Sequence, residues 1–191
     1  MAAPAQAERV LLDGEALRRT VVRIAHEIVE RNPDLERTAL VGIHTRGVPF
    51  AQRLRREIEG FTDFEVGLGT LDITFHRDDV HTREGTGPLH PQPVVRATRL
   101  DFPLEGMTCV LCDDVLYTGR TIRAAIDALF DYGRPARVQL AVLVDRGHRE
   151  LPIRPDYVGK NLPTARDERI QVQLLEVDEV DRVLLVPTPE K

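Results

Sequence analysis

The chain holds 191 residues, enough for one domain with a substantial core, because domains commonly hold about 100–200 residues. Hydrophobic residues make up 42% and charged residues 30%, and the net charge of −5 argues against a surface that grips nucleic acid everywhere. No apolar run approaches the roughly 18 residues of a membrane-spanning helix, and no signal peptide is visible. Two cysteines without a secretory signal favour a cytoplasmic protein with no membrane partner.

The first predicted element is a helix over residues 13–31. Its apolar residues recur every three or four positions from Leu17 to Ile28, which places them on one helix face. Asp13 suits the N-cap position, and Pro33 follows the expected end. We therefore expect one face of this helix to pack on a core.

A strand–loop–helix unit follows, which is half of a βαβ unit. Residues 39–43 form an apolar run of strand length, the polar loop 44–47 interrupts it, and a helical pattern covers residues 48–60. Residues 64–75 are predicted to be extended.

Residues 77 to about 93 show no periodicity and are rich in His, Asp, Arg, Gly and Pro. A loop this long inside a compact domain is usually functional or disordered, so a flexible loop is predicted here. His76, His81 and His90 lie in or beside it, and their spacing suits no compact zinc site. We interpret them as loop residues.

The second half of the chain again alternates strands with a helix, which is predicted over residues 120–130. The predicted strands cover residues 107–112, 137–144, 171–177 and 182–186.

These elements predict an α/β fold: a single domain over residues 1–191 with a mostly parallel sheet and helices on both faces. Ligands of such sheets bind beyond the carboxyl ends of the strands. Three polar loops are expected at those ends, at residues 44–47, 113–121 and 145–150.

The segment from residue 110 to residue 121 carries the most chemical information. A buried strand ends in two carboxylates, Asp113 and Asp114, and a loop containing Gly119 leads directly into a helix. The free N–H groups of a helix N-terminus suit a phosphate, whereas carboxylates suit sugar hydroxyls or a hydrated Mg²⁺ ion. The pattern indicates a ligand that combines a phosphate with a diol; the alternative is a surface acidic pair beside an ordinary N-cap. It matches neither a P-loop nor a dinucleotide-binding fingerprint.

Residues 110–121 resemble the phosphoribosyl-pyrophosphate (PRPP) motif of type I phosphoribosyltransferases, which implies that fold, with a small hood beside the sheet. In that family the two acids contact the ribose hydroxyls and the next loop holds the 5′-phosphate. The loop 44–47 resembles the family's pyrophosphate loop, and Arg77 lies in a segment similar to the loop that closes over pyrophosphate. The implied PRPP-binding residues are Thr45, Arg46, Asp113, Asp114, Val115, Leu116, Tyr117, Thr118, Gly119, Arg120 and Thr121. The implied catalytic residues are Asp113, Asp114, Arg46 and Arg77.

More narrowly, the chain is similar to the PyrR family of bifunctional pyrimidine-operon regulators and uracil phosphoribosyltransferases. Residues 113–121, 144–152 and 157–161 carry this resemblance, and Tyr117 stands where hypoxanthine-type enzymes usually have Asp. The implied reaction converts uracil and PRPP to UMP and pyrophosphate. Mg²⁺ is the implied cofactor; it enters with PRPP, and Asp113 and Asp114 are its candidate ligands. The residues implied for uracil or nucleotide binding are Val144, Asp145 and Arg146.

The same resemblance implies a second partner, the leader mRNA of pyrimidine genes, bound in response to UMP by a homodimer or higher homo-oligomer. The implied RNA-binding residues are Arg19, Arg23, His26 and Lys160. Helical spacing puts the first three on one face, although a charged outer face is normal for any amphipathic helix. Val22 departs from the hydroxyl residue typical of the family, so the alternative of an enzyme without an RNA-regulatory role stays open. A binding module that only senses nucleotides is a third hypothesis.

Two further groups allow a structural interpretation. Cys109 and Cys112 lie three positions apart on a predicted strand and so point to opposite faces, which favours buried packing over a metal site or a disulfide. The triplet 148–150 is either a solvated loop or a set of groups that position the base or contact pyrophosphate.

Overall fold

The computed structural model describes residues 8–76 and 96–188. Within these ranges the chain forms two β-sheets and four α-helices. The strands are β1 (Arg9–Leu12), β2 (Thr38–Ile43), β3 (Gly67–Leu71), β4 (Thr108–Leu116), β5 (Arg137–Asp145), β6 (Tyr157–Asn161), β7 (Glu168–Gln173) and β8 (Arg182–Pro187). The α-helices are α1 (Gly14–Arg31), α2 (Gly47–Thr62), α3 (Arg120–Phe130) and α4 (Leu175–Asp178), and short 3-10 turns cover Leu35–Arg37 and Thr74–His76.

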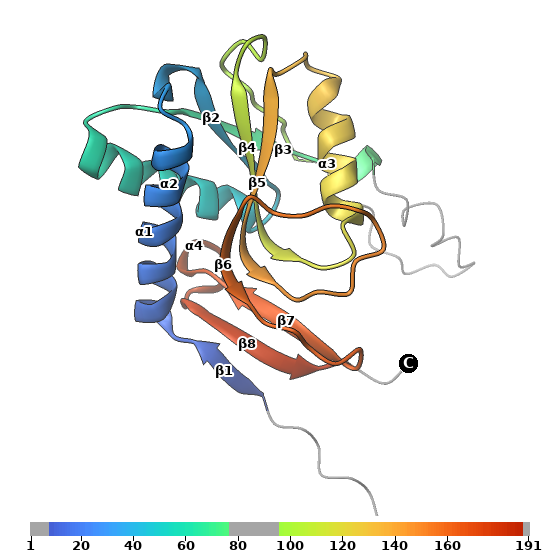
Figure 1. Cartoon of the computed structure of the whole chain (residues 1–191). Coiled ribbons are helices and arrows are strands. Elements are labelled where there is room, and N and C mark those ends of the chain that lie inside the picture. Colours follow the sequence, from blue (N-terminus) through green and yellow to red (C-terminus); the bar gives the residue numbers. More distant parts are fainter. Residues whose placement is uncertain (1–7, 77–95, 189–191) are drawn as a thin grey trace, which may run out of the picture.

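The main sheet has five parallel strands in the order β3-β2-β4-β5-β6. Helices α1 and α2 cover one face and α3 covers the other (Figure 1). Because neighbouring residues of a strand face opposite sides, β2 feeds both cores: Leu40 packs under α1 and α2, whereas Ala39 and Val41 pack under α3. The predicted α/β fold with a parallel sheet and helices on both faces is confirmed.

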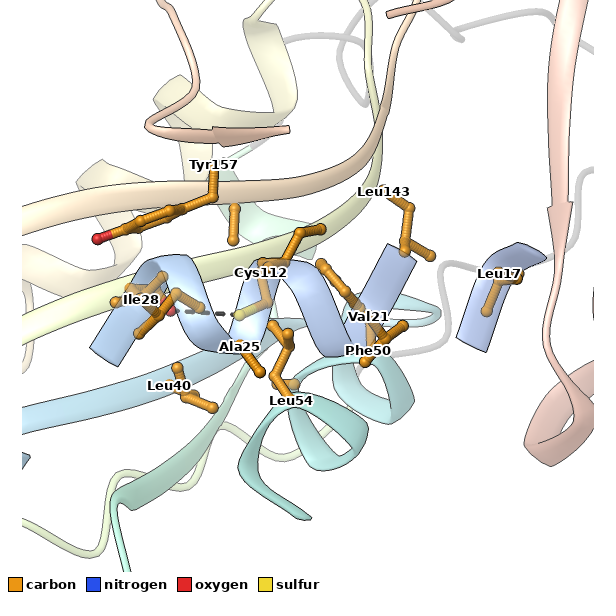
Figure 2. Close-up of a cluster of buried hydrophobic side chains, with 14 of the residues drawn as sticks. Leu17, Val21, Ala25, Ile28, Leu40, Phe50, Leu54, Cys112, Leu143 and Tyr157 are labelled. Carbon is orange, nitrogen blue, oxygen red and sulfur yellow. Dashed lines mark hydrogen bonds between the residues drawn. The ribbon is translucent and has the colours of Figure 1, made fainter. Parts of the chain in front are cut away.

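Helix α1 follows the prediction closely. The Asp13 side chain accepts a hydrogen bond of 2.8 Å from the Ala16 amide and so caps the helix, which ends at Arg31 just before Pro33. The apolar face from Leu17 to Ile28 is buried, and each such side chain contributes about 1.5–3 kcal/mol through removal from water. Figure 2 shows this face directed at the same cluster as Tyr157 of β6.

A second sheet is antiparallel, has the order β1-β8-β7, and lies beyond the carboxyl ends of β4 and β5 (Figure 1). Leu12, Val172 and Val183 from this sheet join the core under α1 and α2. The second sheet corresponds to the small hood that the resemblance implies. It therefore faces the edge of the main sheet where ligands are expected.

Several predicted boundaries were wrong. Strand β4 does not end at residue 112 but continues to Leu116 and contains both aspartates, because its backbone remains paired with β5 as far as Asp145. The strand predicted over residues 171–177 begins at Glu168 and ends at Gln173. The extended segment predicted over residues 64–75 contains only the shorter β3 and a 3-10 turn.

The premature end of β7 has a local cause. The Asp178 carboxylate accepts a hydrogen bond of 2.9 Å from the Leu174 amide, and Asp181 accepts one of 2.8 Å from the Leu175 amide. These two bonds turn the chain into α4. Strands β1 and β6 were not predicted, because each is short. Strand β1 pairs with the distant β8, and β6 pairs with β5.

Candidate active site

The two adjacent acids lie near the carboxyl end of β4, which continues to Leu116. The side chain of Asp113 is nearly buried, with 7% of its surface exposed, and its Oδ1 accepts a hydrogen bond of 3.0 Å from the Asp114 amide. Asp114 in turn accepts a bond of 3.0 Å from the Val115 amide. Burial raises the pKa of the Asp114 carboxyl, while a hydrogen bond with Asp113 and the charge of Arg46 act in the opposite direction. The strand thus holds both carboxyl groups in fixed positions.

The loop after β4 has the geometry of an anion cradle. Gly119 has a φ of 95°, a left-handed conformation that favours glycine, and it is the N-cap of α3. The Thr118 carbonyl accepts hydrogen bonds of 3.0 and 3.1 Å from the amides of Glu150 and Leu151. These bonds fix the loop to the segment after β5. The amides of the first turn of α3 and the helix dipole suit a phosphate.

The loop between β2 and α2 lies beside the acid pair. A Cβ atom at Gly47 would lie 2.2 Å from the carbonyl oxygen of Cys112, so the first turn of α2 packs directly on β4. The His44–Thr45 peptide bond is cis. The Thr45 hydroxyl accepts a hydrogen bond of 2.5 Å from the Arg96 guanidinium. The predicted pyrophosphate loop and the two acids therefore share one end of the sheet.

Arg46 is held by a residue that the sequence did not indicate. Its Nε and Nη2 atoms donate hydrogen bonds of 3.0 and 2.5 Å to the two carboxylate oxygens of Asp178, at the end of α4. This bidentate pair lowers the pKa of Asp178 and raises that of Arg46. The two residues lie 132 positions apart, and no local sequence pattern connects them.

Asp72 organises the neighbouring chain after β3. It accepts hydrogen bonds from the amide of Thr74, at 2.9 Å, and from the amide of Arg96. Burial acts to raise the pKa of Asp72, but hydrogen bonds from Thr74 and Arg96 outweigh it and lower the pKa. Arg96, which sequence reasoning did not single out, is thereby placed against the pyrophosphate loop.

The three residues predicted to bind uracil have different surroundings. Val144 is fully buried, so only its backbone could contact a base. Asp145 accepts a hydrogen bond of 2.9 Å from the Gly147 amide and pairs with Arg149. Arg146 is buried and donates hydrogen bonds of 3.0 Å to Thr164 Oγ1, between β6 and β7, and of 2.7 Å to the carbonyl of Glu168, the first residue of β7.

Tyr117 connects this region to the PRPP motif. The guanidinium carbon of Arg146 lies 4.0 Å from the centroid of the Tyr117 ring, and the His148 ring meets it edge-on at 6.0 Å. Arg149 donates a hydrogen bond of 2.8 Å to the Tyr117 carbonyl. Within the triplet 148–150, Glu150 pairs with Arg120 at 2.7 Å. These contacts hold the triplet in place, although the side chains of His148 and Glu150 are exposed.

An open cavity of about 510 Å³ lies beside this region, at the carboxyl ends of β5 and β6. Its lining includes the predicted residue Asp145 together with two arginines that were not assigned a binding role. The lining residues are Asp145, Gly147, Arg149, Arg154, Pro155, Val158, Asn161 and Pro163.

The residues predicted to bind RNA divide between two parts of one face. Arg23 of α1 reaches β6 and donates hydrogen bonds of 3.0 and 2.6 Å to the carbonyls of Val158 and Gly159, close to Lys160. His26 instead stacks on Phe61 of α2, with ring centroids 4.0 Å apart. Arg19 is exposed and pairs with Glu15.

Arg31 extends the same face, although the sequence did not single it out. It donates a hydrogen bond of 3.0 Å to the Asp156 carbonyl and lies over the ring of Tyr157. The packing of α1 against β6 brings Arg31 close to Asp156 and Tyr157. Gly159 makes the packing close, because a Cβ there would lie 2.6 Å from Thr20 of α1.

Some predicted residues lie outside the described ranges, namely Arg77, His81, His90 and the predicted flexible loop around them. His76 is described and pairs with Asp131 at 2.8 Å. In the part of the chain that the structure describes, no group of three or more His, Cys, Asp or Glu side chains is arranged to hold a metal ion. None of the helices within residues 8–76 and 96–188 is long and apolar enough to cross a membrane.

The two cysteines face opposite sides of β4, as predicted. Cys112 lies in the core under α1 and α2, and Cys109 lies in the core under α3. Both are free thiols, and burial raises the pKa of Cys109 to about 11 and that of Cys112 still further. A thiol with a raised pKa is a poor nucleophile and a poor metal ligand at neutral pH. Their role is packing.

Comparison with known proteins shows the class of protein to which this chain belongs. The family model of the phosphoribosyl transferase domain matches residues 9–179. Among solved structures, the hypoxanthine phosphoribosyltransferase of Trypanosoma cruzi superposes with a TM-score of 0.67 at 20% identity, covering 96% of this chain and 98% of that one. A hypoxanthine phosphoribosyltransferase from Staphylococcus aureus gives a TM-score of 0.66 at 19% identity, with coverage of 95% and 93%. The chain has the fold of these enzymes and belongs to the phosphoribosyltransferase family.

Curated relatives show to which family of phosphoribosyltransferases the chain belongs. Bifunctional protein PyrR of Roseiflexus sp. (strain RS-1) is 57% identical over 182 residues, which cover 95% of this chain and 96% of the relative. Bifunctional protein PyrR of Thermus aquaticus is 58% identical over 175 residues, with coverage of 92% and 93%. The chain belongs to the PyrR family of phosphoribosyltransferases.

Proposed function

We propose that this chain is a uracil phosphoribosyltransferase that also acts as a UMP-responsive, RNA-binding attenuator of pyrimidine biosynthesis genes. The reaction is uracil + PRPP giving UMP + pyrophosphate. One observation carries the catalytic part: the close packing of Gly47 on Cys112 brings the pyrophosphate loop beside the acid pair and the anion cradle at Gly119. Full-length relatives named Bifunctional protein PyrR support the combination of the two roles.

Each part of the site matches one part of PRPP. In the proposed complex, Asp113 and Asp114 accept hydrogen bonds from the ribose hydroxyls, and the amides that begin α3 hold the 5′-phosphate. Thr45 and Arg46 bind the pyrophosphate group, on which negative charge develops as the bond to ribose breaks. Preorganised donors aimed at developing charge lower the barrier to such a reaction. Arg77 is proposed to join them from the predicted flexible loop.

The donor set fits Mg²⁺ that arrives with PRPP. Mg²⁺ is commonly bound through one or two carboxylates together with substrate phosphates, and the described residues offer two adjacent carboxyl groups rather than a complete protein cage. Asp113 and Asp114 are the residues that would hold it. When bound, the ion would supply charge neutralisation at the pyrophosphate.

The uracil site is proposed at the end of β5. Backbone groups of Val144 and Asp145 would contact the base edge, and Tyr117 would border the site. The Tyr117 ring is fixed by Arg146 beneath it and by the carbonyl bond from Arg149. Arg146 would thus support the site from behind, since its own donors are engaged by Thr164 and Glu168.

The RNA-binding role is proposed for the face formed by α1 and β6. Arg19, Arg23, His26 and Lys160 are the residues assigned to it, and the position of Arg31 on the same face adds a further cation. Arginine and lysine there would contact phosphates, which makes binding depend on salt. The RNA-binding form is proposed to be a homodimer or higher homo-oligomer in the cytoplasm, where free thiols such as Cys109 stay reduced.

Two assays test the proposal. Purified protein with Mg²⁺, uracil and PRPP should release UMP and pyrophosphate, whereas hypoxanthine should not replace uracil. The protein should also bind the leader RNA of its own pyrimidine genes more tightly with UMP than without it, and more tightly than a shuffled RNA of equal length. UMP synthesis without preferential RNA binding would leave an enzyme only, and RNA binding without UMP synthesis would remove the catalytic assignment.

A further inference from the structure

The pair between Arg46 and Asp178 joins the pyrophosphate loop to a distant part of the chain. Asp178 ends α4, which connects β7 and β8 of the second sheet, whereas Arg46 precedes α2. Both carboxylate oxygens are used, at 3.0 Å from Nε and 2.5 Å from Nη2, so the guanidinium plane is fixed as well as its position. The Arg46 side chain is 31% exposed and that of Asp178 is 13% exposed. The pair is therefore shielded from water more than an ordinary surface ion pair.

Asp178 is itself held rigidly. Its carboxylate accepts a hydrogen bond of 2.9 Å from the Leu174 amide, and its backbone amide donates one of 2.7 Å to the Leu174 carbonyl. These two bonds make Asp178 a fixed acceptor for Arg46. Two separate ion pairs lie in the same segment: Arg53 of α2 donates bonds of 2.8 and 2.6 Å to Glu176 and of 3.0 and 2.7 Å to Asp181.

The pairing leaves one edge of the Arg46 guanidinium available. A guanidinium has five N–H donors, and Asp178 takes the edge formed by Nε and Nη2. Within residues 8–76 and 96–188, Nη1 of Arg46 donates no hydrogen bond. The charge of Asp114 acts together with Asp178 to raise the pKa of Arg46, so the acid pair lies within electrostatic range of this guanidinium.

We propose that Asp178 is a positioning residue for the transferase reaction: it orients Arg46 so that the free guanidinium edge binds the pyrophosphate group of PRPP. The inference rests on the proposed function. It assigns a role in PRPP and pyrophosphate binding to α4, a segment outside the three loops that follow the main-sheet strands. UMP carries the same ribose and 5′-phosphate but no pyrophosphate group, so the contribution of Asp178 is absent from UMP binding.

The test compares Asp178→Asn with the wild type and with the control Glu176→Gln. The control removes a carboxylate from the same helix, but that carboxylate pairs with Arg53 and not with Arg46. Kd values for pyrophosphate with Mg²⁺ and for UMP are measured by calorimetry, the KM for PRPP is measured by UMP formation, and thermal melting checks folding. A second variant, Asp178→Ser, also removes the carboxylate and is used if the asparagine variant does not fold.

We expect Asp178→Asn to raise the KM for PRPP and the Kd for pyrophosphate by roughly tenfold or more, the scale of one charge-assisted hydrogen bond. The Kd of Asp178→Asn for UMP should stay within about twofold of the wild-type value. The same holds for every constant of Glu176→Gln, because losing one surface ion pair has little effect. Equal losses for UMP and pyrophosphate, unchanged pyrophosphate binding, or tighter binding in the variant would each overturn the proposal. A wild type that forms no UMP would overturn the proposed function instead, so the two failures are distinguishable.

Discussion

Gly47 lies against the backbone of Cys112 so closely that a Cβ atom there would come within 2.2 Å of the Cys112 carbonyl oxygen. This contact joins the start of α2 to β4 immediately before the acid pair. It sets the separation between Arg46, which precedes Gly47, and Asp113, which follows Cys112. The geometry of the candidate active site therefore depends on the absence of a side chain at position 47.

Gly47→Ala should destabilise the protein by about 1–3 kcal/mol and reduce UMP synthesis, because β4 and α2 must separate to admit the methyl group. Gly60→Ala is the matched control in the same helix, since a Cβ there would meet nothing within 4 Å. Replacing that exposed helical glycine should stabilise by roughly 0.5–1 kcal/mol. Urea unfolding and the UMP assay measure both effects. Normal stability and activity of Gly47→Ala would contradict the described packing.

Asp114→Asn and Arg46→Ala should each lower PRPP-dependent UMP formation at least about 100-fold, the scale of losing one preorganised charged contact. Glu30→Gln serves as a control, because it removes an exposed carboxylate of α1 that belongs to neither loop. Steady-state kinetics at saturating uracil measures the loss. If both variants retained normal activity, the assignment of PRPP to this end of the sheet would be wrong.

Acid should remove stability that the ion pairs of Arg53 and Arg46 supply at neutral pH. Burial opposes ionisation of Glu176 and Asp181, but hydrogen bonds from Arg53 outweigh it and lower the pKa of both; the bond from Arg46 lowers the pKa of Asp178. A carboxyl whose pKa is lower in the folded than in the unfolded state stabilises the fold above its unfolded pKa. This contribution is lost as pH falls through the folded pKa.

The free energy of unfolding should therefore decline as pH falls below about 4.5, the ordinary range of carboxyl groups. Arg53→Gln removes the partner of two of these carboxylates, so its decline between about pH 5 and pH 3 should be shallower than that of the wild type. Urea titrations at several pH values give both curves. Parallel curves would show that Arg53 does not set the ionisation of its partners.

Arg23→Ala should weaken binding of the leader RNA by roughly tenfold, the scale of one charge-assisted hydrogen bond, and leave UMP synthesis unchanged. Arg37→Ala is the control, because Arg37 is also an exposed arginine but lies in the turn before β2. Filter binding at two salt concentrations separates phosphate contacts from other effects. Equal loss of RNA binding and of UMP synthesis in Arg23→Ala would indicate a structural role for this arginine in the packing of α1 on β6.

The sequence by itself determined the elements whose signals are local. The apolar face from Leu17 to Ile28 with its Asp13 cap predicted α1, and the alternation of strands and helices predicted the parallel sheet. The two adjacent acids, Gly119 and the helix that follows predicted a site for a sugar phosphate. Such features depend on neighbours within a few residues, so the order of residues alone is enough to indicate them.

The tertiary structure decided what depends on distant partners. The predicted end of the strand β7 was wrong because the Asp178 and Asp181 carboxylates turn the chain at Leu174. Apolar spacing does not reveal this turn. The pairing of Arg46 with Asp178 joins residues 132 positions apart, and Arg23 meets β6 across 135. Contacts of this kind follow from the packing of whole elements, and no local pattern in the sequence encodes which of many carboxylates a given arginine will meet.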